Sequence, residues 1–160
     1  MTVDQLFEGA NLFVVPFWLL IIVLPNWGIT RRVMASPLPF LLLASLYLYL
    51  LSGTLSSEAA QALANPKLSD IARFFAEPRA AATGWIHFLV MDLFVGRWIY
   101  WDGQHKQVWT THSILLCLFA GPLGLFSHLT TAAIVGLLRQ RRDTQNDAAQ
   151  PVNASESTAS

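Results

Sequence analysis

Three long stretches of this 160-residue chain contain no Asp, Glu, Lys or Arg. They cover residues 11–30, 33–57 and 113–138, which are 20, 25 and 26 residues long. A helix needs about 20 apolar residues to cross the ~30 Å hydrocarbon core of a bilayer. Charged residues make up only 12% of the chain, about half of the roughly 25% that is usual in soluble domains. The sequence therefore predicts an integral, multi-pass membrane protein.

We expect an all-α fold, with one transmembrane domain over residues 1–138 built as a four-helix bundle. Residues 57–83 carry interspersed charges of both signs, which favours an extramembrane loop with a short amphipathic helix on the bilayer surface. A lid over a site between the spans is the alternative for this loop. The predicted spans are residues 11–27, 37–55, 84–101 and 110–138.

The fourth segment is interrupted in its middle by Gly121-Pro122, which predicts a kink. Two basic clusters leave the membrane orientation open. Arg31-Arg32 favours a cytoplasmic first loop, whereas four full spans would put the arginines within residues 139–142 on the opposite side. A re-entrant fourth segment would remove this conflict. The polar residues 139–160 are expected to form a disordered tail.

The remaining composition excludes several classes of function. Ten basic residues balance ten acidic ones, so the basic footprint of a nucleic-acid-binding protein is absent. The lone cysteine, Cys117, excludes an internal disulfide framework and a multi-thiolate metal site within the chain. The sequence also contains no Walker loop, dinucleotide fingerprint or nucleophile elbow.

Asp92 is the most informative polar residue, because it lies near the middle of the third predicted span. A carboxylate there costs about 2.5–3.5 kcal/mol on insertion scales, so a neighbouring group must compensate for it. Ionisable residues inside spans often serve a site or a pathway, and pairing that fixes helix packing is the alternative. The candidate catalytic residues are Asp92, His87 in the same span and His128 in the fourth.

Further residues of the third and fourth spans are candidates for ligand binding. Arg97 lies about 6 Å of helical rise from the end of its span, where it can snorkel to the interface or anchor an anion. Gly121 and Gly124 lie on one helix face, where glycines let a helix or a flat ligand approach closely. Trp98 belongs to an interfacial aromatic belt, and His112 lies at the start of the fourth span.

Histidines in a bundle of membrane helices also suggest haem, with His87 and His128 ligating one iron at similar depth. No two histidines recur at spacings such as seven or fourteen residues on one span, so this electron-transfer alternative has little support. We expect neither a cofactor nor a metal ion.

Two blocks of the sequence resemble the abscisic-acid-deficient-four family of small plastid and bacterial membrane proteins. The first runs from Gly84-Trp85-Ile86-His87-Phe88 through residues 91–100 to Asp102-Gly103, and the second covers His112-Ser113 and residues 120–129. Pro16-Phe17-Trp18 and Pro25-Asn26-Trp27 match less closely, and the resemblance spans about residues 10–138. With no transit peptide, the chain is similar to a bacterial, cyanobacterial-type member, which implies a plasma or thylakoid membrane.

Plant members of this family are needed to convert violaxanthin into neoxanthin, an epoxide opening that yields an allene without a change of formula. The resemblance implies a protein of carotenoid metabolism, either a cofactor-free isomerase or an accessory to one. The reaction needs an acid on the epoxide oxygen and a base on a vinylic hydrogen, roles that Asp92 with His87 or His128 can fill.

The alternatives are a non-enzymatic carotenoid-binding or scaffold protein and a haem-binding electron-transfer protein. The expected partners are the lipid bilayer, a carotenoid substrate and other enzymes of the carotenoid pathway. No nucleic acid is expected, and a homo-oligomer is compatible with the sequence.

Overall fold

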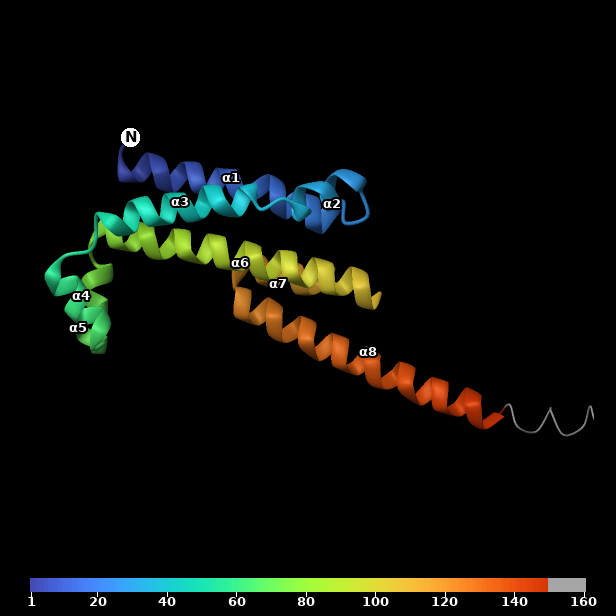
Figure 1. Cartoon of the computed structure of the whole chain (residues 1–160). Helices are drawn as coiled ribbons and strands as arrows, with labels where there is room; N and C mark the ends of the chain where they lie inside the picture. Colours follow the sequence, from blue (N-terminus) through green and yellow to red (C-terminus); the bar gives the residue numbers. More distant parts are fainter. Residues whose placement is uncertain (150–160) are drawn as a thin grey trace, which may run out of the picture.

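The computed structural model describes residues 1–149, apart from the side chains of residues 58, 62, 63 and 147–149. This part of the chain forms eight helices and no strand, which confirms the predicted all-α fold (Figure 1). The helices are α1 (Val3–Val23), α2 (Gly28–Ala35), α3 (Leu38–Ser52), α4 (Ser57–Ala64), α5 (Leu68–Phe75), α6 (Pro78–Lys106), α7 (Thr111–Phe119) and α8 (Gly121–Ala149).

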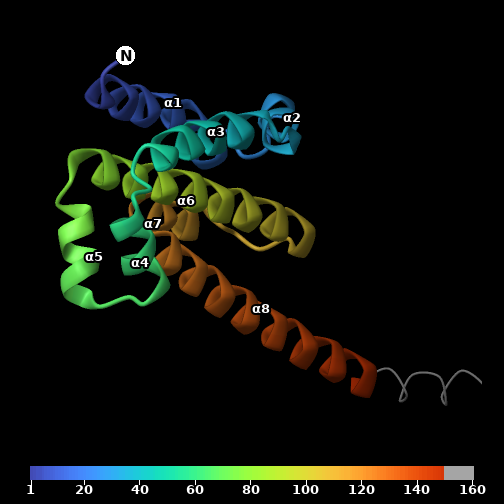
Figure 2. The same cartoon turned by 60° about the vertical axis from the view of Figure 1, so that its left-hand side comes forward.

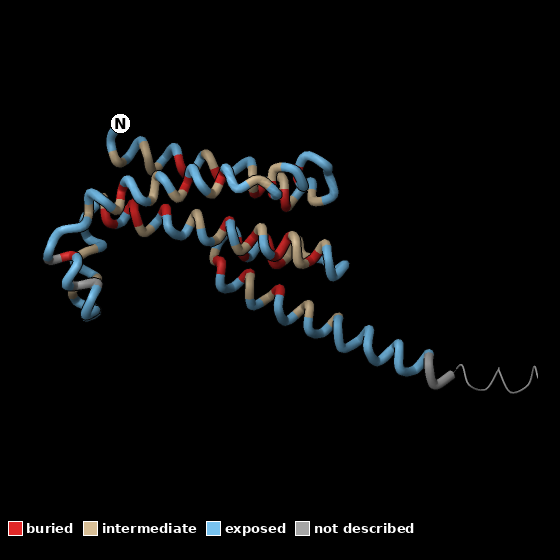
Figure 3. The backbone as a smooth tube through the Cα atoms, in the orientation of Figure 1, coloured by how far each residue is buried: buried red, intermediate tan, exposed pale blue. Residues whose placement is uncertain are grey.

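α6 is the central helix of the fold. It packs against α1, α3, α7 and α8, while the short helices α4 and α5 lie at the end where α3 stops and α6 begins (Figures 1 and 2). Buried positions follow α1, α3 and α6, whereas α8 is exposed over most of its length (Figure 3). The core is apolar and includes Val14, Trp18, Ile21, Leu43, Leu50, Ile86, Leu93, Ile99, Ile114 and Cys117.

Polar contacts fix the position of α1 along α6. Near one end, the Trp85 indole donates a hydrogen bond to Asn11 Oδ1 over 2.9 Å. Near the other end, the Tyr100 hydroxyl donates to the carbonyl oxygen of Pro25, also over 2.9 Å. Between them, Trp18 packs on Gly96, where a Cβ atom would lie 2.7 Å from the indole ring. The two hydrogen bonds are separated by about 22 Å of helical rise, so sliding of α1 along α6 would break both.

By length and apolar composition, α1 and α8 can cross a membrane, and α2 with α3 can form a third crossing as a pair bent by 41°. The sequence predicted four such spans, and the largest difference is at α6. This helix is long enough, with 29 residues, but Asp92 and Arg97 lower its mean hydropathy. Its central position explains how such residues are accommodated, because helices packed around it can satisfy their polar groups.

α7 and α8 form an antiparallel hairpin, which differs from the single kinked helix predicted over residues 110–138. Ser113 faces Ser127 with 3.0 Å between their hydroxyl oxygens, and His112 Nε2 lies 3.1 Å from Thr131 Oγ1. The earlier residue on α7 thus contacts the later residue on α8, as expected for two antiparallel helices. The helix stops because Ala120 is extended, with φ −161° and ψ 106°. The chain thus reverses at Ala120, and the re-entrant alternative stays a prediction.

Residues 57–83 contain two short helices and the first residues of α6, which begins at Pro78 instead of the expected Gly84. Arg79 fastens this region to α3, because its guanidinium donates to the carbonyl oxygens of Tyr49 and Leu50 over 3.1 Å each. At the other end of the chain, α8 continues to Ala149, so residues 139–149 are helical where a disordered tail was expected. Residues 150–160 lie outside the described part.

Candidate functional site

The polar residues of α6 form two separate clusters. Asp92 is in the middle of the helix, and Asp102 lies ten residues later, near the C-terminal end. Ten helical residues correspond to about 15 Å of rise. Each carboxylate residue has its own partners in the α7–α8 hairpin.

Asp92 holds the start of α8. Its Oδ1 atom accepts a hydrogen bond from the backbone N–H of Gly121 over 3.1 Å, and its backbone oxygen accepts one from the Cys117 thiol over 3.2 Å. The positive end of a helix dipole favours a negative charge at this place. The first residue of α8 must be small, because a Cβ at position 121 would collide with the Asp92 carboxylate. Asp92 thus joins the tip of the hairpin to α6.

Gly124 serves the same junction. A side chain at this position would collide with the Cys117 Cβ and lie 2.6 Å from the backbone of Cys117. Glycine therefore lets α7 and α8 approach closely just after the turn. The space that the sequence suggested for a flat ligand beside Gly121 and Gly124 is occupied by Asp92 and by α7.

His87 lies five residues before Asp92 on α6 and contacts α3. It is exposed, and its ring packs against Tyr47 of α3, with 5.7 Å between the centroids. Within the described residues, no hydrogen bond joins it to Asp92 or His128. The predicted combination of Asp92, His87 and His128 is therefore divided between three places in the structure.

His128 belongs to the second cluster, where it forms a pair with Asp102. The imidazole is fully buried, and its Nε2 lies 2.8 Å from Asp102 Oδ2. Lys106, one turn further along α6, places its Nζ 2.9 Å from the same oxygen. An ionised carboxylate can only accept hydrogen bonds. His128 Nε2 therefore donates this hydrogen bond, and Nδ1 is the ring nitrogen that is not bound to Asp102.

Nδ1 of His128 is buried and has no hydrogen-bonding partner in the described part of the chain. An imidazole with one nitrogen bound to a carboxylate and a free lone pair on the other is suited to act as a general base. The carboxylate fixes the tautomer and stabilises the imidazolium that forms when Nδ1 takes a proton. The Asp102–His128 pair is the strongest candidate for acid–base chemistry in this fold.

The charge of Asp102 is supported by its surroundings. Partial burial acts to raise the pKa of this carboxyl, but the hydrogen bonds and positive charges of Lys106 and His128 outweigh it. The net result is a pKa below the ordinary value. Asp102 follows Trp101, where the predicted third span ends, and it is ionised at neutral pH.

A row of hydrogen bonds joins α7 to α8 next to this pair. His112 Nε2 lies 3.1 Å from the hydroxyl oxygens of both Thr131 and Ser113, and Ser113 in turn contacts Ser127. His112 Nδ1 is a second buried ring nitrogen without a partner among the described residues. His112 therefore forms part of the hairpin interface, and Ser113 connects it to Ser127, the residue before His128.

Trp98 and Arg97 are neighbours in sequence but have different surroundings. The Trp98 ring meets His128 edge to face, with 5.5 Å between centroids, and it is partly exposed. Arg97 donates to the carbonyl oxygen of Ala35 over 3.4 Å and lies 5.0 Å from the centroid of the Phe40 ring. Trp98 thus belongs to the Asp102–His128 cluster, and Arg97 connects α6 to α2 and α3.

Asp102, Lys106 and Ser127 were not predicted as site residues from the sequence. Asp102 and Lys106 are separated by four residues, the spacing that brings opposite charges together on a helix. Asp102 also lies within the first block that resembles the family. That spacing could have identified it, whereas its contact with His128 depends on the fold of the hairpin.

No group of three or more His, Cys, Asp or Glu side chains in the described residues could hold a metal ion.

A family model described as ABA DEFICIENT 4-like matches residues 5–128. Among curated proteins, the chloroplastic protein ABA DEFICIENT 4 of Arabidopsis thaliana is 40% identical over 137 residues. The match covers 82% of this chain and 62% of the plant protein, so the chain spans less than two thirds of that relative. No solved structure matches the chain.

Proposed function

This chain belongs to the ABA DEFICIENT 4-like family, and we propose that it is a membrane-embedded isomerase of carotenoid metabolism. In this proposal, the Asp102–His128 pair opens the epoxide of a xanthophyll end ring and forms an allene. The observation that carries the proposal is the buried, unpartnered Nδ1 of a histidine whose other nitrogen is bound to a carboxylate.

Membrane embedding is supported by the distribution of aromatic residues. Exposed aromatic side chains lie near both ends of the bundle: Tyr49 and Trp85 at one end, and Trp27 and Trp109 at the other. Aromatic belts of this kind mark the two interfaces of a membrane protein. From residue 80 to residue 101, α6 rises about 32 Å, close to the ~30 Å thickness of a bilayer core.

The Asp92 cluster and the Asp102–His128 cluster lie at different depths in the proposed membrane. A xanthophyll is a long apolar polyene with an oxygenated ring at each end, so in a bilayer its rings lie near the interfaces and its chain crosses the core. Asp92 would lie beside the middle of the polyene, where there is no epoxide. Asp102 and His128 lie near the interface, where the reacting ring would lie.

The proposed step requires no oxidant or reductant. His128 Nδ1 removes the hydrogen from the vinylic carbon next to the epoxide, and that electron pair forms the second double bond of the allene. The C–O bond of the adjacent epoxide carbon breaks, and the alkoxide oxygen takes up a proton from the imidazolium or from water. Atoms and charge balance, so the product is an isomer of the substrate. Asp102 stabilises the imidazolium intermediate.

Trp98 controls access in this proposal. Because His128 is fully buried, a substrate reaches Nδ1 only if a neighbouring side chain moves. The indole of Trp98 contacts the imidazole and is partly exposed, so it is the side chain whose rotation would open a path from the lipid.

The test is pigment conversion in a bacterial strain that accumulates violaxanthin. His128→Gln keeps an amide near the position of Nε2, where it can still donate to Asp102, but it removes the basic nitrogen. Conversion per folded protein should fall by ~10²-fold or more. His87→Gln is the matched control, since that histidine lies outside the pair, and it should convert normally.

Normal conversion by a folded His128→Gln protein would refute the catalytic assignment. The unmodified protein could instead bind violaxanthin without converting it, in a strain that contains all other carotenoid enzymes. That result would establish a carotenoid-binding or accessory role.

A further inference from the structure

We infer that the end of the molecule formed by α2, the last turn of α6 and residues 139–142 of α8 is a binding surface for anionic lipid headgroups. This surface, here called the basic end, faces the cytoplasmic side or its stromal equivalent. The α7–α8 hairpin enters and leaves the membrane on that side. The inference rests on the membrane embedding proposed above, and it is independent of the isomerase chemistry.

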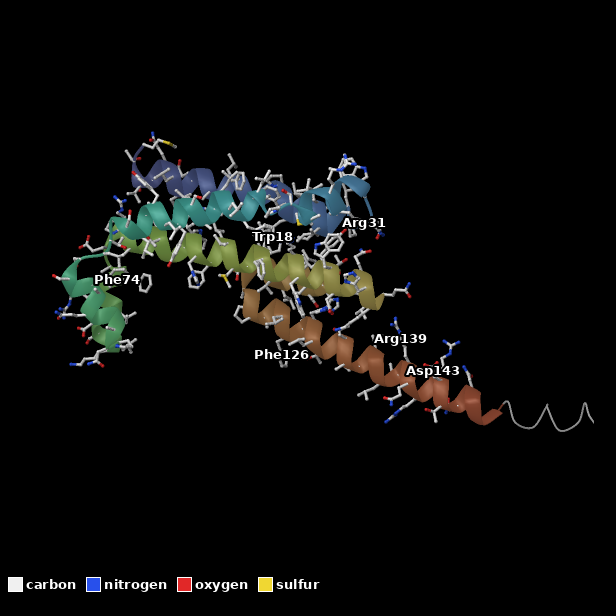
Figure 4. The ribbon with its side chains drawn as sticks, in the orientation of Figure 1. Trp18, Arg31, Phe74, Phe126, Arg139 and Asp143 are labelled. Carbon is white, nitrogen blue, oxygen red and sulfur yellow. The ribbon has the colours of Figure 1, made fainter. Side chains whose placement is uncertain are left out.

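Side-chain contacts bring two distant basic segments to one end. Arg31 Nη2 donates to Gln104 Oε1 over 3.5 Å, which connects α2 to the last turns of α6. Arg139 donates to the carbonyl oxygens of Lys106 and Gln107 over 2.6 Å and 2.9 Å, which connects α8 to the same turn. Figure 4 shows Arg31 and Arg139 at one end of the bundle and Phe74 at the other.

The hairpin is the reason for this arrangement. Its tip is held by Asp92 in the middle of α6, and α8 then returns toward the end of α6 from which α7 came. A fourth helix that crossed the membrane completely would place Arg139 on the side opposite Arg31. The structure thus removes the conflict between the two basic clusters that the sequence left open.

The two ends of the bundle differ in charge. Among the described side chains, the basic end has six cations, all exposed, and one carboxylate, Asp102, which pairs with one of these cations, Lys106; Asp143 follows directly after this end in α8. At the opposite end, the described charged side chains are three cations and four carboxylates. The cations of the basic end are Arg31, Arg32, Lys106, Arg139, Arg141 and Arg142. The charged residues of the opposite end are Lys67, Arg73, Arg79, Asp4, Glu8, Asp70 and Glu77.

This distribution fits a lipid surface. Positive residues near the ends of membrane helices favour the cytoplasmic side, and the anionic lipids of that leaflet attract clusters of Lys and Arg. Arginine, which supplies five of the six cations, binds phosphate and sulfate groups with two parallel hydrogen bonds. Trp27 and Trp109 lie at the same end with 47% and 71% exposure, and such indole rings are typical of the headgroup region.

The first experiment maps the two ends by cysteine labelling, in a background where Cys117 is replaced by Ser. Single cysteines at Asn26 and Gln140 probe the basic end, and cysteines at Gln5 and Ser69 probe the other end. A membrane-impermeable maleimide should label the first two only in inverted vesicles and the last two only in intact spheroplasts. Labelling of Asn26 and Gln140 from opposite sides, or of both from outside, would overturn the inference.

The second experiment tests the lipid headgroup with charge-matched variants. Phosphatidylglycerol, compared with phosphatidylcholine, should raise the melting temperature of the detergent-solubilised parent. The double variant Arg141→Gln/Arg142→Gln keeps Arg139, which connects α8 to α6. It should reduce the rise in melting temperature by at least half. Lys67→Gln/Arg73→Gln removes the same charge from the opposite end and should keep the full rise. Equal effects of the two double variants, or no rise in the parent, would exclude an anionic-lipid surface at the basic end.

These outcomes separate the inference from the proposed function. Release of the protein from membranes by alkaline carbonate would refute membrane embedding and the lipid surface together. Correct labelling and lipid response in a protein that converts no violaxanthin would refute only the isomerase. A basic end that responds to an acidic protein but not to phosphatidylglycerol would overturn the lipid assignment.

Discussion

Replacement of Asp92 by Asn tests how the helical hairpin is held. The asparagine keeps an oxygen that can accept the hydrogen bond from Gly121, and it removes the negative charge. Loss of the interaction with the α8 dipole should cost about 0.3–1 kcal/mol, up to ~2 kcal/mol in a partly buried site. Removal of a charge from the middle of a span should return about 2.5–3.5 kcal/mol. Asp92→Asn should therefore be at least as stable as the parent.

Asp92→Ala is the matched comparison, because it removes the acceptor as well as the charge. The Gly121 N–H is then left without its partner in the described structure, at a cost of about 1–3 kcal/mol. We expect the Ala variant to be less stable than the Asn variant by that amount, measured as the free energy of unfolding in mixed micelles. Violaxanthin conversion per folded protein should be normal in the Asn variant.

Two results would contradict this account. Equal destabilisation of the Asn and Ala variants would show that the charge of Asp92, and not its hydrogen bond to α8, holds the hairpin. A fall of ~10²-fold in conversion by a folded Asn variant would make Asp92 a catalytic residue, and the proposed reaction site would then move to the middle of the bundle.

Three more predictions address the hairpin and the Asp102–His128 pair. Gly124→Ala should destabilise the protein by about 1–3 kcal/mol in the same unfolding assay, because the methyl group meets α7, whereas Gly136→Ala, in open space, should be neutral or stabilising by up to ~1 kcal/mol. The pKa of Asp102 is lowered from its ordinary value of 3.8, so the ionised carboxylate stabilises the fold at neutral pH, and this stabilisation is lost as the pH falls below 3.8. Lys106→Met removes one cause of the lowered pKa and should therefore raise the pH at the midpoint of acid unfolding. Trp98→Ala should speed labelling of His128 by diethyl pyrocarbonate if the indole covers it, and an unchanged rate would exclude that role.

The sequence predicted the helices better than their connections. The charge-free runs predicted the all-α class and placed α1 and α3 approximately, and the predicted span over residues 84–101 lies within α6. The same charge-free run over residues 113–138 suggested one long helix, because composition reports how apolar a segment is and not whether it reverses. The contacts that distinguish a hairpin from a kink, such as that of Gly124 with α7 and that of Ser113 with Ser127, are tertiary contacts.

The site was predicted in part for a similar reason. His128 and Trp98 were selected from the sequence, and the structure brings them together. Asp92 was selected because a carboxylate in a span needs compensation, and that argument was sound, but the partner proved to be a backbone N–H that has no signature in sequence. Asp102 was overlooked because it lies at the end of a span, where a charge needs no special explanation.

The return of α8 has a consequence for the parity of membrane crossings. If α1, the bent α2–α3 pair and α6 each cross once and the hairpin does not, the number of crossings is odd. The first residue of α1 and the last residue of α8 then face different compartments. Fusions of a reporter enzyme before α1 and after α8 would therefore sample opposite sides of the membrane.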